Sequence, residues 1–326
     1  MAVFHARWSS LKTFRTCQMK YKYSWLENLQ SRRPPAPLIR GSMIGQCLDA
    51  SASKKSIKPI LAGYQEEYGK LFKAEQEEYG DIIGEVERIV TNYKKLYKGD
   101  GLTYLKGKDG NPYEIQVETE FTIDGVKVHF TGHIDKLVRD PEERTLVLDH
   151  KSHKAIPDVN ARYNDLQLLT YVWLLPLSGL PKADGVLWDY LRTKPPTVPE
   201  VLKNGSLTKR ANLDSDLQTY LQAIQDNKLD PADYQEVLDR FKAEGGNRYF
   251  ERVIVPAPPK ALIDNMVSDF KTTIVQIHDV TKSGNFVRNM SRDCNRCEFY
   301  NLCQTELRGI DSSFIRKQDY KERKIV

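Results

Sequence analysis

Apolar and polar residues alternate along the segment 113–123. An alternation with a period of two predicts a β-strand with one buried face. Asp124-Gly125 follows at once, and this dipeptide favours the tight turn of a hairpin. A second alternating segment starts at Val126, so the pattern predicts two antiparallel strands. The apolar positions of the pair are Ile115, Val117, Phe121, Ile123, Val126, Val128 and Phe130.

The unbroken apolar run Leu146-Val147-Leu148 predicts another strand. Such a run is typical of a strand that is covered on both faces, with its charged end emerging at the sheet edge. A polar turn, Asp140–Glu143, precedes this strand. The segments 164–175 and 185–191 then predict a helix and a last strand. The order strand, strand, strand, helix indicates an α/β core between residues 113 and 191.

Helical periodicity dominates the segments on both sides of this core. The N-terminal region, 1–98, predicts helices at 43–53, 61–77 and 82–97, after a stiff proline-rich connector at Arg33–Pro37. Beyond the core, residues 197–246 predict a helical insertion with helices at 213–225 and 231–244. Residues 247–306 predict a strand at 247–255, a long helix at 259–282 and a cysteine-rich end, and 307–326 form a tail. We interpret residues 1–326 as one elaborated domain.

Composition narrows the class of protein only moderately. The chain has 326 residues, of which 40% are hydrophobic, so it can bury a substantial core. No apolar run approaches the length that crosses a membrane. The net charge of +5 and the pI near 8.7 permit nucleic-acid binding without establishing it. An odd number of cysteines and the lack of a secretory signal indicate a reducing cytoplasm rather than disulfides.

The basic residues are unevenly distributed along the chain. One basic group lies among aromatic residues near the N-terminus, and a second follows the core. Bases alternating with aromatic rings are able to hold phosphates and stack on unpaired bases. The alternative is that the rings pack inside the fold while the lysines are solvated. The first group is Lys12, Arg15, Lys20 and Lys22 with Phe14, Tyr21, Tyr23 and Trp25, and the second is Arg192, Lys194, Lys203, Lys209 and Arg210.

Asp135, Asp149 and Lys151 form the first candidate site. Asp149 and Lys151 are two apart on a predicted strand, so their side chains project to the same face. Carboxylates are preferred ligands of Mg²⁺ and Mn²⁺, so Asp135 and Asp149 are candidate metal ligands, with the backbone carbonyl of His150 as a third. Lys151 is placed to orient a water molecule or to neutralise developing charge.

An isolated Asp-x-Lys is more often a surface ion pair of little energetic consequence. The order of elements argues for a site here. Consecutive predicted strands deliver Asp135 and Asp149, and the next helix places Gln167 and Tyr171 on one face, one turn apart. The five candidate catalytic residues are Asp135, Asp149, Lys151, Gln167 and Tyr171.

The phrases Gly132-His133-Ile134-Asp135, Asp149-His150-Lys151 and Gln167 to Tyr171 resemble the GxxD, DxK and QxxxY motifs of the RecB branch of the PD-(D/E)XK nuclease superfamily. The resemblance implies an α/β fold with a restriction-endonuclease-like mixed sheet flanked by helices, in which 113–191 is the nuclease core. It also implies Mg²⁺- or Mn²⁺-dependent hydrolysis of DNA. The resemblance covers residues 9–191 and 248–303 and leaves the insertion at 197–246 unexplained.

One position departs from the family pattern. RecB-type enzymes usually carry a histidine ligand in a phrase like Gly-x-x-x-His, and here Gly41-Ser42-Met43-Ile44-Gly45 has a glycine instead. Either the remaining carboxylates suffice, alone or with Gln46, or one metal position is weak, or activity is lost. Glu118 and Glu120 are possible supplementary ligands, and a solvated strand face explains them at least as well.

Three of the five cysteines, Cys294, Cys297 and Cys303, fall within ten residues, which indicates a metal site. The phrase resembles the C-terminal triplet of the iron–sulfur nucleases, which include AddB and CRISPR-associated exonucleases. In those families the fourth ligand is N-terminal, and Cys17 occupies the matching position. Four thiolates suit a [4Fe–4S] cluster or Zn²⁺, and the resemblance favours the cluster. Cys47 is expected to be a small buried residue.

These features support three functional hypotheses. The first is a metal-dependent DNA exonuclease with a [4Fe–4S] cluster, acting in recombination, repair or replication. The second is a catalytically inactive DNA-binding or scaffold protein that retains the fold and cluster. The third is a zinc-stabilised interaction protein. The resemblance is strongest to phage-encoded members, which implies the host cytoplasm and a recombinase or single-strand-annealing protein as a further partner beside DNA.

Overall fold

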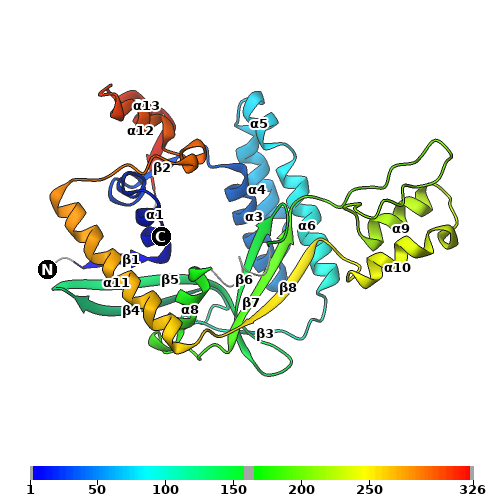
Figure 1. Ribbon diagram of the computed structural model, residues 1–326, viewed down its shortest axis with the longest axis horizontal. Helices are drawn as coiled ribbons and strands as arrows, with labels where there is room; N and C mark the ends of the chain where they lie inside the picture. Colours follow the sequence, from blue (N-terminus) through cyan, green and yellow to red (C-terminus); the bar gives the residue numbers. More distant parts are fainter. Residues whose placement is uncertain (1–2, 158–164, 324–326) are drawn as a thin grey trace.

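The computed structural model describes residues 3–157 and 165–323, and these build a mixed β-sheet flanked by helices (Figure 1). Its order is β1-β5-β6-β7-β8, with β3 and β4 also pairing with β5. The β1–β5 and β6–β7 pairs are parallel, and the other pairs are antiparallel. The strands are β1 (Phe4–Arg7), β3 (Thr103–Leu105), β4 (Tyr113–Ile123), β5 (Val126–Arg139), β6 (Thr145–His153), β7 (Gly185–Arg192) and β8 (Phe250–Pro256).

The predicted hairpin is confirmed at residue level. Ile123 pairs with Val126, and the two turn residues Asp124 and Gly125 both have positive φ, at 47° and 78°. Two positive φ angles are the requirement of the tight hairpin turn that Asp-Gly favours. The turn fixes the register of β4 against β5, and hence the level at which each side chain of β5 stands.

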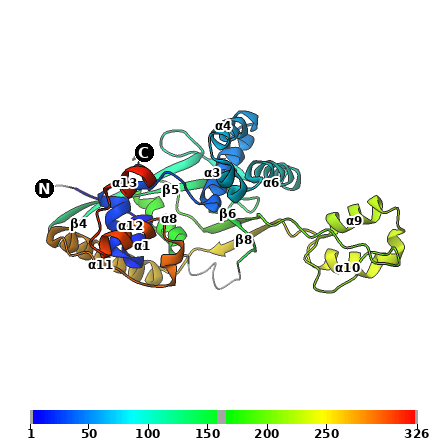
Figure 2. The ribbon, with the colours of Figure 1, turned by 90° about the horizontal axis from the view of Figure 1, so that it is seen from above.

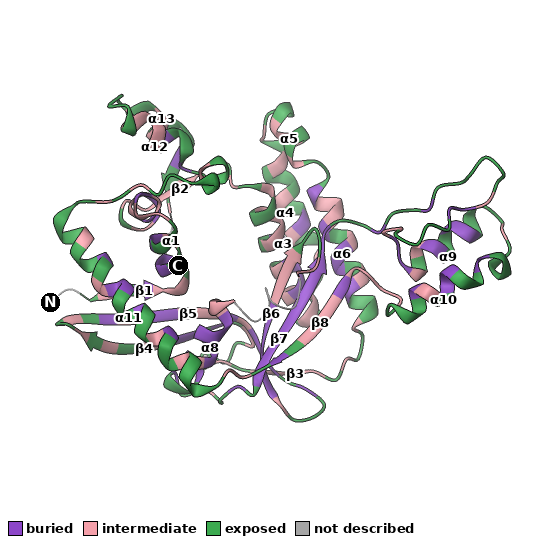
Figure 3. Cartoon of the chain, viewed as in Figure 1, coloured by how far each residue is buried: buried purple, intermediate pink, exposed green. Residues whose placement is uncertain are grey.

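The run Leu146-Val147-Leu148 is completely buried, as expected for a strand with both faces covered. Val147 packs into a cluster with α1, α8 and α11, whereas Leu146 and Leu148 pack on the opposite face of the sheet. On that opposite face α3, α4 and α6 form a second cluster with Leu191 and Phe250, and Figure 3 shows the buried positions concentrated along β6 and β7. These helices are α1 (Trp8–Thr16), α3 (Ala36–Ala52), α4 (Lys58–Gly69), α6 (Ile82–Leu96), α8 (Leu166–Leu177) and α11 (Lys260–Ser283).

Some sequence-based boundaries are wrong. The single helix expected at 61–77 is two, because α4 ends at Gly69 and α5 (Lys73–Tyr79) starts anew with the Glu75 carboxylate accepting from the Phe72 amide at 2.8 Å. The expected tail contains α13 (Ser313–Asp319) and β9 (Tyr320–Glu322), and β9 pairs with β2 (Leu29–Ser31). The remaining short elements are α2 (Gln18–Tyr21), the π-helical turn Lys22–Leu26, a 3-10 turn at Arg292–Arg296 and α12 (Tyr300–Leu307).

The helical insertion is a small unit with its own core. It contains α9 (Leu217–Asp226), a 3-10 turn at Pro231–Tyr234 and α10 (Gln235–Ala243), packed around Tyr220, Tyr234 and Phe241. Figure 2 shows it standing apart from the sheet, on a neck formed by the chain that leaves β7 and returns to β8. Within the described ranges, no helix is both long enough and apolar enough to span a membrane.

Candidate active site

Asp135 and Asp149 meet where β5 and β6 stop pairing. The last pairs of this ladder are Leu137 with Val147 and Lys136 with Leu148, so Asp135 stands one residue beyond, opposite Asp149. The Asp135 carboxylate accepts a hydrogen bond from the backbone amide of His150 at 2.9 Å. This side-chain hydrogen bond takes the place of the next backbone hydrogen bond between β5 and β6. It fixes the Asp135 carboxylate at the point where the two strands diverge.

The two carboxylates differ in their electrostatics. Asp149 is 2% exposed, and burial, followed by the negative charge of Asp135, raises its pKa to about 7. Burial acts in the same direction on Asp135, but the hydrogen bonds and charge of His150 outweigh it, so the pKa of Asp135 is lowered. The negative charge of one carboxyl group thus disfavours ionisation of the other. A divalent cation bound between them would stabilise both carboxylates.

Lys151 joins the carboxylates to α8. Its Nζ lies 2.7 Å from Oδ2 of Asp149 and 3.4 Å from Oε1 of Gln167. Burial opposes the charge of Lys151, but Asp149 more than compensates, so the pKa of the lysine is raised. The Gln167 Nε2 group donates to the hydroxyl of Tyr171 at 2.9 Å. The structure therefore brings the five sequence-predicted residues into one connected group.

The opposite face of the sheet carries a buried network that the sequence did not reveal. The His150 ring lies 3.5 Å from Asp135 and 3.7 Å from Asp189, a fully buried carboxylate in β7. Arg252 donates to Asp189 at 3.1 Å, and the Tyr93 hydroxyl also donates to it. These partners are distant in sequence, and the only sequence signal was a lone charge in the otherwise apolar and aromatic strand 185–191.

Other acidic and polar candidates are engaged elsewhere. Glu118 lies 2.9 Å from the ring of His129, and Glu120 is exposed on β4 opposite His129. Gln46 donates to the hydroxyl of Tyr64 at 3.0 Å, on the side of α3 that faces α4. The carboxylate that does approach Asp135 is Glu114. Burial, then the charge of Asp135, raises the pKa of this partly exposed residue to about 7.

Gly45 lies on the face of α3 that approaches the site. One turn before it, a Cβ on Gly41 would lie 3.7 Å from the Ser152 hydroxyl, and one turn after it Asp49 pairs with Lys136 at 3.0 Å. A Cβ added to Gly45 would meet nothing within 4 Å. The position offers no side-chain ligand of its own, and there is room for a Cβ atom.

Few metal-ligating side chains lie where β5 and β6 diverge. Among the described residues there is no group of three or more His, Cys, Asp or Glu side chains arranged to hold a metal ion. Asp135 and Asp149 supply two side chains, and a third ligand would have to come from the backbone, for which the His150 carbonyl is the candidate. Hard carboxylate oxygens and the raised pKa of Asp149 fit Mg²⁺ or Mn²⁺ at this place.

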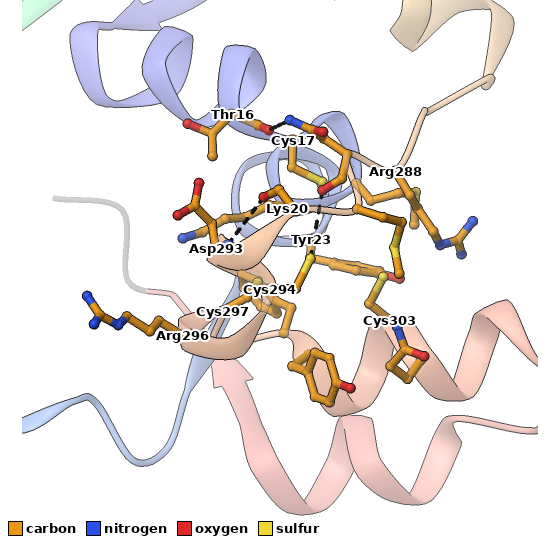
Figure 4. A pocket seen from close by; sticks show the side chains of 17 residues that line it. Thr16, Cys17, Lys20, Tyr23, Arg288, Asp293, Cys294, Arg296, Cys297 and Cys303 are labelled. Carbon is orange, nitrogen blue, oxygen red and sulfur yellow. Dashed lines mark hydrogen bonds between the residues drawn. The ribbon is translucent and has the colours of Figure 1, made fainter.

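The four cysteines of the expected iron–sulfur frame line one cavity of about 270 Å³ (Figure 4). Cys17 comes from the end of α1, and Cys294, Cys297 and Cys303 come from the turn and helix near the C-terminus. All four thiols are free, yet within the described ranges no three of them are arranged to hold a metal ion. Cys47 is completely buried between α3 and α6, and burial raises the pKa of its thiol to about 11.

The aromatic residues of the N-terminal basic group are part of the core. Phe14, Tyr21 and Tyr23 are at most 4% exposed, and Tyr23 packs beside the cysteine cavity. Rings buried to this degree have no face free for a base. Of the two alternatives left open by the sequence, packing inside the fold is therefore correct for these three.

Comparisons with known proteins agree with this fold. The model of the PD-(D/E)XK nuclease superfamily matches residues 8–304, and members of that superfamily are generally metal-dependent nucleases. No curated protein matches the chain. Among solved structures, the crystal structure of SSO0001 aligns over 82% of this chain and 96% of its own, with 14% identity and a TM-score of 0.33. So low a TM-score leaves the family match as the basis of the assignment.

Proposed function

The chain belongs to the PD-(D/E)XK nuclease superfamily, and from this premise we propose that it is a divalent-metal-dependent DNA exonuclease of the RecB type. The observation that carries the proposal is the pair of the half-buried Asp135 and the buried Asp149, next to Lys151. Two carboxyl groups that hold a metal ion, with an ammonium beside them, are suited to metal-assisted phosphodiester hydrolysis.

Each residue has a proposed role. Asp135 and Asp149 hold Mg²⁺ or Mn²⁺, assisted by the backbone carbonyl of His150. The bound ion supplies polarisation of the phosphate and a lowered pKa for the attacking water. Lys151 orients that water or neutralises the developing charge. Gln167 and Tyr171 either hold the ammonium of Lys151 in place through the hydrogen bonds described above or contact the DNA.

The finer parts of the proposal concern the cysteines and the pathway. Cys17, Cys294, Cys297 and Cys303 are proposed to bind a [4Fe–4S] cluster, because four thiols from both ends of the chain surround one cavity. When bound, the cluster would fasten α1 to the C-terminal helices. The resemblance favours a role in DNA recombination, repair or replication. If the protein is phage-encoded, it would act in the cytoplasm of the host, beside a recombinase or single-strand-annealing protein.

A direct test is digestion of DNA by anaerobically purified protein. End-labelled linear DNA and covalently closed circular DNA are incubated with Mg²⁺, Mn²⁺ or EDTA. An exonuclease degrades the linear form only, and only with metal. Asp149→Asn and Lys151→Met should each reduce degradation by at least about a hundredfold. Glu120→Gln, which changes an exposed charge on β4, is the matched control and should retain activity.

Other outcomes have definite meanings. Cleavage of the closed circle would replace exonuclease with endonuclease activity. Full activity in Asp149→Asn or Lys151→Met would refute the assigned site. An inert wild-type protein with both metals would favour the catalytically inactive DNA-binding protein, for which Gly45 at the usual histidine position is the specific support.

A further inference from the structure

A cleft of about 710 Å³ lies between the ends of β6 and β8 and the neck of the insertion. Its walls carry basic residues from three separate segments. Lys154 follows β6, Arg192 ends β7, and Arg248 precedes β8. Lys194, in the chain that leads into the insertion, completes the basic lining. The base of the insertion, where the chain leaves β7 and returns to β8, therefore forms one wall of the cleft.

Positive charge exceeds negative charge in this cleft. Four lysine and arginine residues line it against three carboxylates, an excess of one, because the fifth basic lining residue, Arg252, is paired with Asp189 and Asp100. Arg192, Lys194 and Arg248 all converge on Asp214, with Lys194 at 2.9 Å and Arg248 at 3.9 Å. Arg248 also pairs with Glu244, so two carboxylates face three cations and one positive charge is left over. The hydrogen bond from Arg192, with further help from Lys194, lowers the pKa of Asp214 to about 2, as expected in a positive field.

Arg192 has unused hydrogen-bonding capacity. Its side chain is 9% exposed, and one nitrogen, Nη2, contacts Asp214. Its Nε is buried and has no hydrogen-bond partner among the described residues. A buried guanidinium without its full set of acceptors is costly, and an anion entering the cleft would supply them.

Arg192, in the cleft, lies on the same face of the sheet as Lys151 of the candidate active site. In the parallel β6–β7 pair Lys151 is level with Tyr190, and His153 is level with Arg192. Side chains alternate along a strand, so Arg192 projects from the same face as Lys151, two residues further along. Two residues advance about 7 Å, which is roughly two base steps of 3.4 Å along a nucleic-acid strand.

We propose that this cleft binds the phosphate backbone of the nucleic-acid strand on one side of the scissile phosphate, with the insertion serving as a clamp. The inference rests on the proposed nuclease function and extends it to residues that the family match does not explain. The scissile phosphate lies beside Asp135, Asp149 and Lys151. The phosphates that follow it along the strand contact Arg192, Lys194 and Arg248. The contacts go to phosphates, so binding is independent of base sequence.

The test measures binding by the full chain in EDTA, where cleavage does not interfere. Anisotropy of a labelled single-stranded oligonucleotide of about 16 nucleotides is recorded over a range of salt concentrations. Lys194→Ala and Arg248→Ala should each weaken binding at least about threefold and reduce the slope of log K against log salt by about 0.7. Lys242→Ala is the matched control, because Lys242 has the same 55% side-chain exposure as Lys194 but lies on α10, outside the cleft lining.

Asp214→Asn gives a prediction of opposite sign. Loss of this carboxylate frees Arg192 and Lys194 for phosphate, so the variant should bind the oligonucleotide more tightly than wild type. Circular dichroism and thermal unfolding of each variant confirm that it folds. A variant that binds better cannot be explained by misfolding, which separates charge from structural damage.

The proposal is overturned if Lys194→Ala and Arg248→Ala behave like Lys242→Ala, or if Asp214→Asn does not tighten binding. It is also overturned if polyglutamate of equal charge competes as well as the oligonucleotide, since an acidic peptide would then be the occupant. Binding with the expected variant pattern in a protein that cleaves no DNA would leave the cleft established and the proposed catalysis refuted. If the protein cleaves DNA and the cleft variants have no effect on binding, the proposed catalysis stands and the proposed cleft function is refuted.

Discussion

Tyr171 lies so close to Gly132 that a Cβ atom built on the glycine would be 2.9 Å from Cε1 of the tyrosine ring. The same ring carries the hydroxyl that accepts from Gln167, whose carbonyl oxygen faces Lys151. Gly132 therefore allows α8 to approach β5 closely enough for the Lys151 contact. Gly132 of the GxxD motif and Tyr171 of the QxxxY motif are therefore in direct packing contact.

Gly132→Ala should consequently destabilise the protein by about 1–3 kcal/mol, because the ring is buried and cannot yield without displacing α8. Nuclease activity should fall with it. Gly45→Ala is the matched control: a Cβ there meets nothing within 4 Å, and alanine in a helix interior is more stable than glycine by roughly 0.5–1 kcal/mol. Urea unfolding of both variants checks the opposite signs. Equal effects of the two substitutions would contradict the close contact.

The raised pKa of Asp149 predicts how stability depends on pH without metal. In the unfolded chain the pKa of this carboxyl is about 3.9, whereas burial and the charge of Asp135 raise its pKa to about 7 in the folded protein. Between these values the folded state binds more protons than the unfolded state. The free energy of unfolding should therefore decrease as pH rises from about 4 to about 7.

Urea unfolding at several pH values in EDTA measures this dependence. Asp149→Asn removes the titrating carboxyl, so its profile should be flatter than that of wild type over the same window. It should not become fully flat, because Glu114 also has a pKa raised to about 7. Parallel profiles for the two proteins would show that Asp149 does not titrate in this range.

The Asp189 network predicts a large stability effect at Arg252. This arginine donates to the fully buried Asp189 at 3.1 Å and to Asp100 at 2.7 Å. Arg252→Met leaves the Asp189 charge without its cation and should reduce the free energy of unfolding by about 3–5 kcal/mol. The double variant Arg252→Met/Asp189→Asn removes both charges and should recover part of the loss. If the double variant is the less stable one, the ion pair does not account for the effect.

The cysteine cavity makes a compositional prediction. Protein purified without oxygen should be brown and contain about four irons and four sulfides per chain if the four lining thiols are ligands. Cys17→Ala should lower the iron content and the melting temperature together. Cys47→Ala, at a buried thiol between α3 and α6, should leave the iron content unchanged. Stoichiometric zinc, or iron that depends on Cys47 instead of Cys17, would overturn this ligand set.

Local patterns in the sequence were sufficient for the elements that carry the site. The alternation in 113–123, the Asp-Gly turn and the apolar run before Asp149 each act over a few residues, and β4, the turn and β6 follow them closely. The spacing of Gln167 and Tyr171 likewise fixed their common helical face. These features depend on backbone geometry and side-chain alternation, which a short segment determines by itself.

Tertiary structure alone decided which charges meet. Asp189, Arg252 and Tyr93 come from three elements, and their pairing depends on how β8 and α6 pack on β7. Glu118 and Gln46 were plausible ligands by sequence, yet His129 and Tyr64 engage them because those partners stand nearer in space. The basic cleft likewise required the fold, since Arg192 and Arg248 approach Asp214 only when the insertion returns the chain to β8. Electrostatic interactions depend on distance through space, and residue spacing along the chain does not encode it.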